Sequence, residues 1–301
     1  MIHAISTSAQ QYAWGKHGLD SQVAQLAQNI SIDAKAPYAE LWMGTHPKAP
    51  SALLASQKLL KDHLSLKTCG KPFDVYKDLP FLFKVLSVGT ALSIQAHPDK
   101  KLAAHLFKTR PDIYKDGNHK PEMAIALTVF EALVGFRPLA DIAMFLANIP
   151  ALRTVVGEEL SAQFIKVAAD PVAAEQHGRR VLKGIFSALQ KWTPVAESID
   201  TILSQLAKLA GSSPLPIYSI ANTVTTRLAV EYPGDIGILC VFLLNILTLQ
   251  PTQAVYLGAG VPHAYLAGDC VECMATSDNV VRSGLTPKLR DVDTLLEMLT
   301  V

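Results

Sequence analysis

Residues 139 to 245 have the apolar spacing of helices, whereas the segments on either side alternate as strands do. Two runs in this block each place their apolar residues on one helical face: Val181, Leu182, Ile185, Phe186, Leu189 and Trp192, then Ile199, Ile202, Leu203, Leu206 and Leu209. Pro171, Pro194 and the segment 211–214 separate the helices. The sequence therefore predicts a mixed β and α protein, in which a β-rich part, 1–138 and 246–301, is interrupted by an all-helical insertion, 139–245.

Length and charge narrow the possible functions. The chain has 301 residues, half of them hydrophobic, so it can bury a sizeable core. Its 27 basic and 26 acidic residues give no long-range attraction to nucleic acid or to an anionic membrane. The start, Met1-Ile2-His3-Ala4, carries no secretory pattern, and the apolar stretch 236–249 is too short to span a bilayer. We expect a cytoplasmic protein with no nucleic-acid or membrane partner.

The four cysteines do not form a recognisable metal or redox motif. Only Cys270 and Cys273 are spaced as C-x-x-C, and no second pair or matching histidine pair accompanies Cys69 and Cys240. The surroundings of the C-x-x-C pair look like a strand, whereas a redox pair normally opens a helix. We interpret all four as reduced, structural thiols.

The stretch 92–98 has one apolar and one polar face. Read as a strand, it places Leu92, Ile94 and Ala96 on one side and Ser93, Gln95 and His97 on the other. The polar side could line a cavity, and Gln95 and His97 could hold one metal ion. The same alternation also suits a half-exposed edge strand with a polar outer face.

Other polar residues stand in apolar surroundings. Lys84 lies in the middle of a strand-like run and either reaches the surface or faces a cavity. Glu122 leads into apolar residues and must be paired, protonated or bound to a metal, with an ion pair to Lys120 as the simpler interpretation. His263 follows a glycine-rich turn, where it either caps the turn or completes a set of one Gln, one Glu and two His that suits zinc.

Aromatic and charged clusters indicate a pocket. Aromatic residues lie next to Gly and Pro in 11–15 and 38–47, which predicts short strands and turns around a pocket, or ordinary core packing by Trp14 and Trp42. Near the other end, Arg282 and Lys288 follow Glu272, which lies in an apolar context. Converging cations of this kind could bind phosphate or a developing oxyanion, although surface charge is the simpler interpretation.

Six segments in collinear order resemble type I mannose-6-phosphate isomerases: QQYAWG, YAELWMGTHP, LPFLFKVLSV, LSIQAHPDK, NHKPEMAIAL and VPHAYLAGDCVECMATSDNVVRSGLTPK. The resemblance implies a cupin-type (jelly-roll) β-sandwich catalytic domain with a helical insertion and one zinc ion per chain. It also implies an aldose-ketose isomerase that interconverts mannose 6-phosphate and fructose 6-phosphate through a cis-enediol and feeds GDP-mannose synthesis. We expect the enzyme to be monomeric.

The resemblance also implies roles for individual residues. The metal ligands of the family match Gln95, His97, Glu122 and His263, and its essential arginine matches Arg282. Around the cavity, the family places residues that match Trp14, Glu40, Lys84, Ser93, Lys120, Glu272 and Lys288. We expect Glu272 to be the general base, with Lys120 or a zinc-bound water as the alternative. We expect Ser93 with Lys84 or Lys288 to hold the phosphate.

Two departures from the family pattern are visible. Pro251-Thr252-Gln253-Ala254 stands where the family usually has Pro-Gly-Glu-Ala. After the predicted helix 292–299, we expect the C-terminal β-sandwich domain of the family to be missing. We therefore expect metal binding to be retained and stability and activity to be reduced. Two other hypotheses stay open, a non-catalytic metal-bound sugar-phosphate-binding protein and an iron-dependent cupin oxygenase. A purely structural protein would leave the polar strand faces unexplained.

Overall fold

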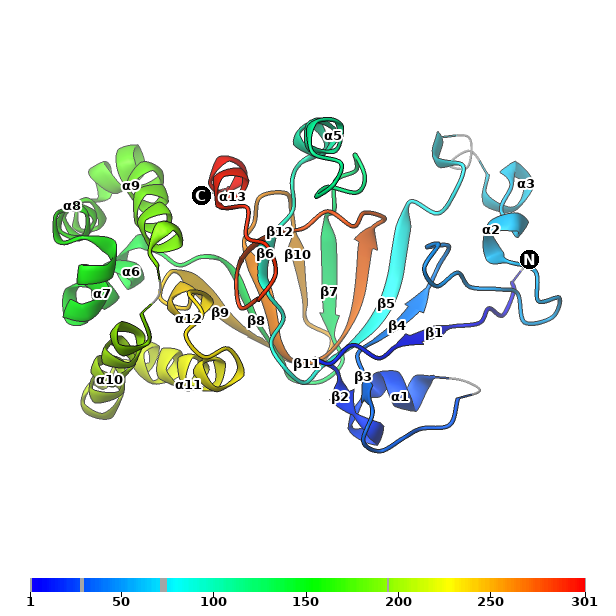
Figure 1. Ribbon diagram of the computed structural model, residues 1–301, viewed down its shortest axis with the longest axis horizontal. Coiled ribbons are helices and arrows are strands. Elements are labelled where there is room, and N and C mark those ends of the chain that lie inside the picture. Colours follow the sequence, from blue (N-terminus) through cyan, green and yellow to red (C-terminus); the bar gives the residue numbers. More distant parts are fainter. Residues whose placement is uncertain (1, 28–29, 71–74, 194, 301) are drawn as a thin grey trace.

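One long strand, β11 (His263–Ala275), joins the two halves of the β domain. In the computed structural model, which describes residues 2–27, 30–70, 75–193 and 195–300, β11 pairs antiparallel with four other strands. Its C-terminal part lies between β5 (Phe81–Val88) and β7 (Glu122–Ala126), and its N-terminal part lies between β6 (Ile94–Ala96) and β8 (Phe130–Phe136). Both layers therefore share one central strand (Figure 1).

β11 changes layer at Gly268. The register with β8 shifts between Tyr265 and Ala267, and Gly268 has a φ of +107°, a backbone conformation that only glycine adopts readily. A Cβ atom at this position would lie 2.4 Å from the carbonyl oxygen of Val129, so the close approach also requires glycine. The two layers then enclose a core that includes Leu86, Ala124, Phe130 and Tyr265.

The other strands extend the two layers. One layer has the order β1-β4-β5-β11-β7-β10 and the other has the order β12-β6-β11-β8-β9. These strands are β1 (Ser8–Gln10), β4 (Glu40–Met43), β9 (Leu244–Leu249), β10 (Ala254–Leu257) and β12 (Val281–Gly284), and a separate pair consists of β2 (Lys16–His17) and β3 (Pro37–Tyr38). Short helices lie on the periphery: η1 (Gly18–Asp20), α1 (Gln22–Leu26), α2 (Leu60–His63), α3 (Leu66–Cys69), α5 (Lys100–Thr109) and α13 (Val292–Met298).

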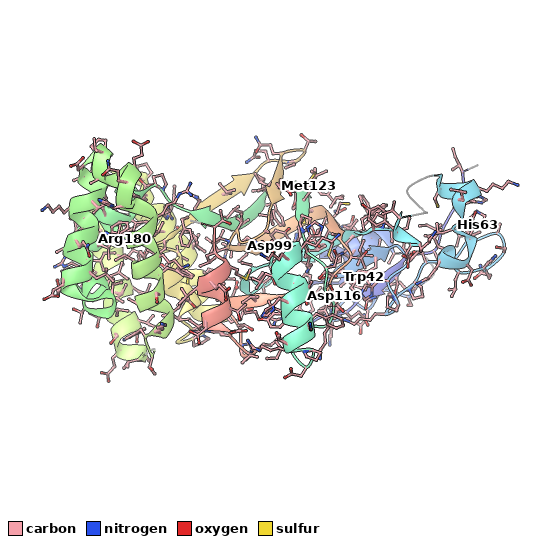
Figure 2. The ribbon with its side chains drawn as sticks, turned by 90° about the horizontal axis from the view of Figure 1, so that it is seen from above. Trp42, His63, Asp99, Asp116, Met123 and Arg180 are labelled. Carbon is pink, nitrogen blue, oxygen red and sulfur yellow. The ribbon has the colours of Figure 1, made fainter. Side chains whose placement is uncertain are left out.

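The helical insertion lies at one end of the β domain (Figure 1). Its helices are α6 (Leu139–Asn148), α7 (Pro150–Val156), α8 (Glu158–Ala169), α9 (Pro171–Lys191), α10 (Ala196–Ser212), α11 (Pro216–Glu231) and α12 (Gly237–Cys240). α7, α9 and α11 each begin with proline, whose fixed φ suits the first helical position. From above, Arg180 of α9 and His63 of α2 mark the opposite ends of the elongated molecule (Figure 2).

A single apolar core connects the insertion to the β domain. It joins Ile185 and Phe186 of α9 with Ile94 of β6, Leu133 of β8 and Leu295 of α13, all buried. Burial of this kind stabilises a domain by about 25 cal/mol for each Å² of apolar surface removed from water. The insertion is therefore packed against the layer that contains β6 and β12.

The predicted fold class is confirmed, with local differences in the elements. The stretch 92–98 is a strand only over Ile94–Ala96, because β11 pairs with it at a single position, His263 with Gln95, and β12 pairs with it only at Ile94, Gln95 and Ala96. α10 extends to Ser212, inside the predicted linker 211–214. Pro194 lies outside the described residues.

Two further features of the described residues are the state of the cysteines and the length of the apolar helices. All four cysteines are free; Cys240 and Cys270 are buried, and Cys69 and Cys273 are half-buried. Within the described ranges, no single helix has the length and apolar character needed to cross a membrane. The pair α6 and α7 passes that test together but is bent by 110°.

Candidate metal centre and adjoining pocket

Three buried side chains from different parts of the chain converge on one point. One ligand atom from each of His97, Glu122 and His263 lies within 4.8 Å of the other two. The Nε2 atom of His97 lies 3.5 Å from Glu122 Oε1, and the Nε2 atom of His263 lies 3.2 Å from Glu122 Oε2. Each of the three residues is at most 3% exposed. Two imidazoles and a carboxylate at this spacing are a donor set suited to a divalent metal such as zinc.

The backbone fixes which nitrogen of each imidazole is available. His97 Nδ1 lies 2.7 Å from the carbonyl oxygen of Asn279, and His263 Nδ1 lies 2.9 Å from that of Val261. Because a carbonyl oxygen only accepts hydrogen bonds, each Nδ1 carries the proton and each Nε2 presents a lone pair. Both Nε2 atoms and Glu122 Oε2 are buried without a hydrogen-bond partner. These unsatisfied donor atoms fit a bound metal ion.

The charges at the centre also suit metal binding. Burial lowers the pKa of His97 to about 4, although Glu122 opposes this shift. Burial would raise the pKa of Glu122, but Lys120, whose Nζ lies 3.2 Å from Glu122 Oε1, and the nearby imidazoles hold that pKa well below its usual value. At neutral pH the centre therefore has a neutral His97 and an ionised Glu122, the protonation states that a metal requires of its ligands.

Strand register places two more predicted residues beside this centre. Gln95 of β6 lies opposite His263 of β11 on one side and opposite Arg282 of β12 on the other. Side chains at directly opposed positions of antiparallel strands project from the same face of the sheet. Gln95, His263 and Arg282 therefore form a row across three strands.

A cavity of about 300 Å³ adjoins this row. Seven of the twelve predicted site residues line it: Trp14, Glu40, Ser93, Gln95, Lys120, Arg282 and Lys288. Ala91, Leu92, Tyr232, Leu285, Thr286 and Pro287 complete the wall. The pocket thus has three cationic side chains and one carboxylate at its surface.

Apart from His97, Glu122 and His263 of the metal centre, two predicted residues, Lys84 and Glu272, do not line this cavity. Lys84 Nζ is 3.3 Å from a carboxylate oxygen of Glu40 and 3.3 Å from one of Glu272, and all three side chains are buried. Burial would lower the pKa of Lys84, but the two carboxylates raise it well above the usual value. Burial raises the pKa of Glu272, and Lys84 opposes that rise. Lys84 is therefore a permanent cation beneath the pocket.

Three residues with a part in the site were not singled out from the sequence as site residues. Trp42 Nε1 donates a hydrogen bond to Glu40 Oε2, and the Lys84 ammonium lies 5.3 Å from the Trp42 ring centroid. Tyr232 comes from the helical insertion and reaches the pocket wall. Asn279 supplies the carbonyl oxygen that orients His97. The only sequence signals were a Trp two positions after Glu40 and turn residues around 232–235 and 278–279.

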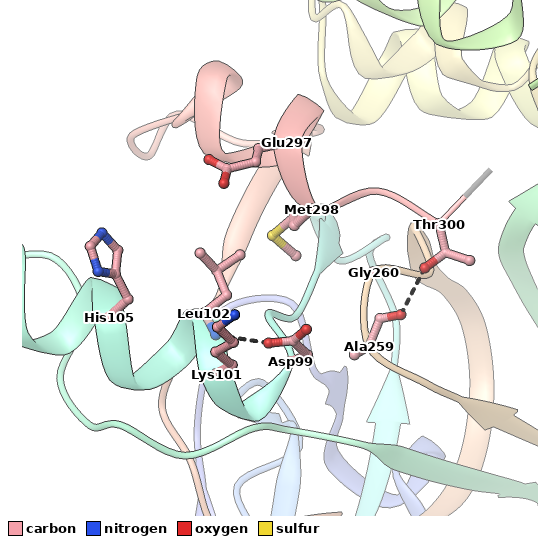
Figure 3. Close-up of a pocket in the computed structure, with 9 residues that line it drawn as sticks. All are labelled: Asp99, Lys101, Leu102, His105, Ala259, Gly260, Glu297, Met298 and Thr300. Carbon is pink, nitrogen blue, oxygen red and sulfur yellow. Dashed lines mark hydrogen bonds between the residues drawn. The ribbon is translucent and has the colours of Figure 1, made fainter. Parts of the chain in front are cut away.

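A larger cavity, of about 550 Å³, lies between α5, α13 and the loop before β11 (Figure 3). It contains none of the predicted site residues. In its wall, Thr300 Oγ1 donates a hydrogen bond to the carbonyl of Ala259 (3.2 Å), and Gly260 N–H donates to the carbonyl of His97 (2.9 Å). This wall therefore supports the loop that leads to His263.

The shared strand, the two-layer β domain and the buried imidazole-carboxylate centre define a cupin-type protein with a candidate metal site. Residues 2–139 match the family description "Phosphomannose isomerase type I, catalytic domain", and residues 155–244 match "Phosphomannose isomerase type I, helical insertion domain". The chain belongs to the type I phosphomannose isomerase family.

Individual relatives agree with this assignment. The chain is 46% identical to a mannose-6-phosphate isomerase of Cryptococcus neoformans, over 99% of this chain and 75% of the relative. It is 44% identical to the human mannose-6-phosphate isomerase, over 99% of this chain and 73% of that protein. A zinc-bound crystal structure of mannose 6-phosphate isomerase superposes with a TM-score of 0.80 at 32% identity, over 99% of this chain and 74% of that one.

Proposed function

We propose that this protein is a zinc-dependent isomerase that interconverts mannose 6-phosphate and fructose 6-phosphate. The proposal rests on two buried imidazole nitrogens and a carboxylate oxygen that lie close together and have no hydrogen-bond partner. They lie beside a pocket lined by three cationic side chains. Family membership and relatives that are mannose-6-phosphate isomerases support the substrate. Zinc is supported by the zinc-bound neighbour and by the donor set.

His97, Glu122 and His263 would hold the zinc ion, with Gln95 as the fourth ligand from the neighbouring strand. Bound zinc supplies a Lewis acid that polarises the oxygens at the reacting carbons. Gln95 also lines the pocket, so one side chain links the metal centre to the substrate space.

The two ends of the pocket have different tasks. We assign the phosphate to Ser93 and Lys288, which line the cavity, because Lys84 is already paired with two carboxylates and does not line it. Trp14 and Glu40 would contact the sugar between the phosphate and the metal. A remote charged anchor of this kind orients the substrate for reaction.

The reaction moves a proton between adjacent carbons. A base removes the proton from C2 of the open-chain aldose while O1 gains a proton, which gives a cis-enediol. A proton is then added to C1 while the O2 hydroxyl loses its proton, which gives the ketose. Glu272 is our candidate base, because burial raises its pKa. Its side chain does not line the cavity, and Lys120, which does, is the alternative base. Arg282 and Lys120 line the pocket and would stabilise the negative charge on the oxygens of the enediol.

The proposal extends to the pathway, the compartment, the oligomeric state and the domain division of the enzyme. Mannose 6-phosphate made by the reverse reaction would feed the synthesis of GDP-mannose, in the cytoplasm and by a monomeric enzyme. The domain division 1–138, 139–245 and 246–301 belongs to the proposal as well, with the pocket bordered by all three segments through Ser93, Tyr232 and Lys288.

A coupled assay of fructose 6-phosphate formation from mannose 6-phosphate tests the proposal on this chain. We expect turnover that a chelator abolishes and that zinc restores, with about one zinc ion per chain by elemental analysis. Binding of mannose 6-phosphate without turnover would instead indicate a sugar-phosphate-binding protein. Stoichiometric iron in place of zinc would indicate an oxygenase of the cupin class.

A further inference from the structure

The end of helix α11 holds one of the two loops that border the pocket. Glu231 Oε2 accepts a hydrogen bond from the backbone N–H of Ala91 (2.9 Å), and the Tyr232 hydroxyl donates one to the Ala91 carbonyl. Adjacent side chains of the helical insertion therefore bind both backbone groups of a single residue. Ala91 lies two positions before Ser93, and both line the pocket.

Asp235, three residues further on, holds the other loop. Its Oδ1 accepts hydrogen bonds from the backbone N–H of Leu285 (2.7 Å) and of Gly237 (2.6 Å), and its Oδ2 accepts one from Thr286 (3.1 Å). Leu285 has a φ of +53°, a conformation that is unfavourable for a residue with a side chain. The carboxylate thus holds a strained turn directly before Pro287 and Lys288.

Two glycines bring the insertion and this second loop into direct backbone contact. A Cβ atom on Gly237 would lie 2.5 Å from the backbone nitrogen of Leu285, and a Cβ atom on Gly284 would lie 2.6 Å from Gly237 Cα. Neither position can accept a side chain without movement of the backbone. The contact between the insertion and the end of β12 is therefore a close-packed one.

We propose that Glu231, Tyr232 and Asp235 are positioning residues that set the distance between Ser93 and Lys288, and through it the affinity of the pocket for the phosphate of its substrate. The inference rests on the proposed function, because it takes the ligand to be a sugar phosphate. Glu231 and Asp235 are not among the residues that line the pocket. Their carboxylates face backbone N–H groups, so they order the anion site without repelling the anion at short range.

The test uses the zinc-loaded full chain with Asp235→Ala and Glu231→Ala as separate variants. We expect the Kd for inorganic phosphate, measured by titration calorimetry, and the KM for mannose 6-phosphate to rise together by about tenfold, while kcat and zinc content change little. Leu206→Ala is the matched control. Leu206 is buried in the core of the insertion, and it takes no part in the hydrogen bonds that hold the two loops. We expect this variant to have a lower melting temperature but an unchanged Kd and KM.

Unchanged Kd and KM in both variants, a fall in kcat alone, or no phosphate binding by the unsubstituted protein would each overturn the inference. If the unsubstituted protein binds phosphate but does not turn over mannose 6-phosphate, the proposed function fails, and the Kd values still decide the positioning role. If Asp235→Ala does not fold, Asp235→Asn, which keeps one acceptor oxygen, and Glu231→Ala decide it.

Discussion

Gln95 and His263 are direct register partners on the antiparallel strands β6 and β11, although the whole helical insertion lies between them in the sequence. Their side chains project from the same face, and Arg282 continues the row on β12. The backbone ladder, rather than a flexible loop, thus spaces a metal-centre histidine, a candidate amide ligand and a pocket arginine. Substitutions that leave the ladder intact should change chemistry without moving the neighbouring groups.

Replacing His263 with alanine should remove the metal and the activity. His263 presents an unpartnered Nε2 atom to Glu122, so its loss leaves an incomplete donor set. We expect zinc content to fall from about one ion per chain to near zero and turnover to fall below detection, measured by elemental analysis and the coupled assay. His177→Ala, at an exposed position on α9, should change neither. Full zinc content in His263→Ala would contradict the assignment.

Removing the Asn279 side chain should weaken metal binding without removing a ligand. Asn279 Nδ2 donates to the carbonyls of Asp116 (2.6 Å) and Asn118 (3.1 Å), which holds in place the backbone carbonyl that orients His97. We expect Asn279→Ala to lower zinc affinity by about 10- to 100-fold, measured by chelator competition.

The control for that measurement is Asn148→Ala. Asn148 also donates two hydrogen bonds from its side chain, to the Met144 carbonyl and the Tyr218 hydroxyl, but within the helical insertion. It should lose stability of about 1 kcal/mol without losing zinc affinity. Equal zinc affinities in the Asn279 and Asn148 variants would show that the Asn279 side chain does not act on His97.

Lys84→Met should destabilise the fold, and more so at high pH. The substitution leaves the buried carboxylates of Glu40 and Glu272 without their cation, at a cost of about 3–5 kcal/mol. The pKa of Glu272 is already raised in the folded protein and rises further without Lys84.

The sign of that pH dependence follows from proton binding. A carboxyl whose folded pKa exceeds its unfolded pKa stabilises the fold at low pH, and that stabilisation is lost as pH rises through the folded value. Urea unfolding of Lys84→Met should therefore show a larger deficit at about pH 8 than at about pH 5. Lys48→Met, at an exposed pair with Asp278, should show little deficit at either pH. A deficit independent of pH would contradict the argument.

The four thiols should react at different rates with a reagent such as DTNB. Cys240 and Cys270 are buried, and burial raises the pKa of Cys240 to about 12, so neither should react in the folded protein. Cys69 should react first and Cys273, whose pKa burial also raises, more slowly. All four should react in denaturant. Rapid reaction of more than two thiols in the native protein would contradict the burial of Cys240 and Cys270.

The spacing of apolar and polar residues along the chain is local information, and it predicted the type of each segment and several candidate site residues. Alternation made Gln95 a candidate ligand, and apolar context did the same for Glu122, because a buried polar residue must have a partner. His263 became a candidate because it follows a glycine-rich turn. The all-helical insertion followed from the 3.6-residue spacing of residues such as Ile185 and Phe186. The resemblance to a known family then supplied roles that no spacing could assign.

Strand pairing and side-chain burial depend on residues that are far apart in the sequence, so local patterns do not predict them. Nothing in the alternation of 92–98 shows that β6 lies between β11 and β12, which is what aligns Gln95 with Arg282. Lys84 looks the same in sequence whether it faces a cavity or two buried carboxylates. Tyr232 follows the last turn of a helix, where a pocket residue has no distinguishing pattern.

The central place of β11 has a consequence for the order in which the chain can fold during synthesis. Four strands that pair with β11 leave the ribosome before it: β5, β6, β7 and β8. They cannot pair with β11 until the whole helical insertion has been synthesised. The insertion closes its contacts over short sequence distances and can form first, whereas the two layers and the imidazole pair must wait for residues 263–275. A nascent chain arrested before residue 263 would thus carry a folded helical unit beside unpaired strand edges, the form most exposed to aggregation.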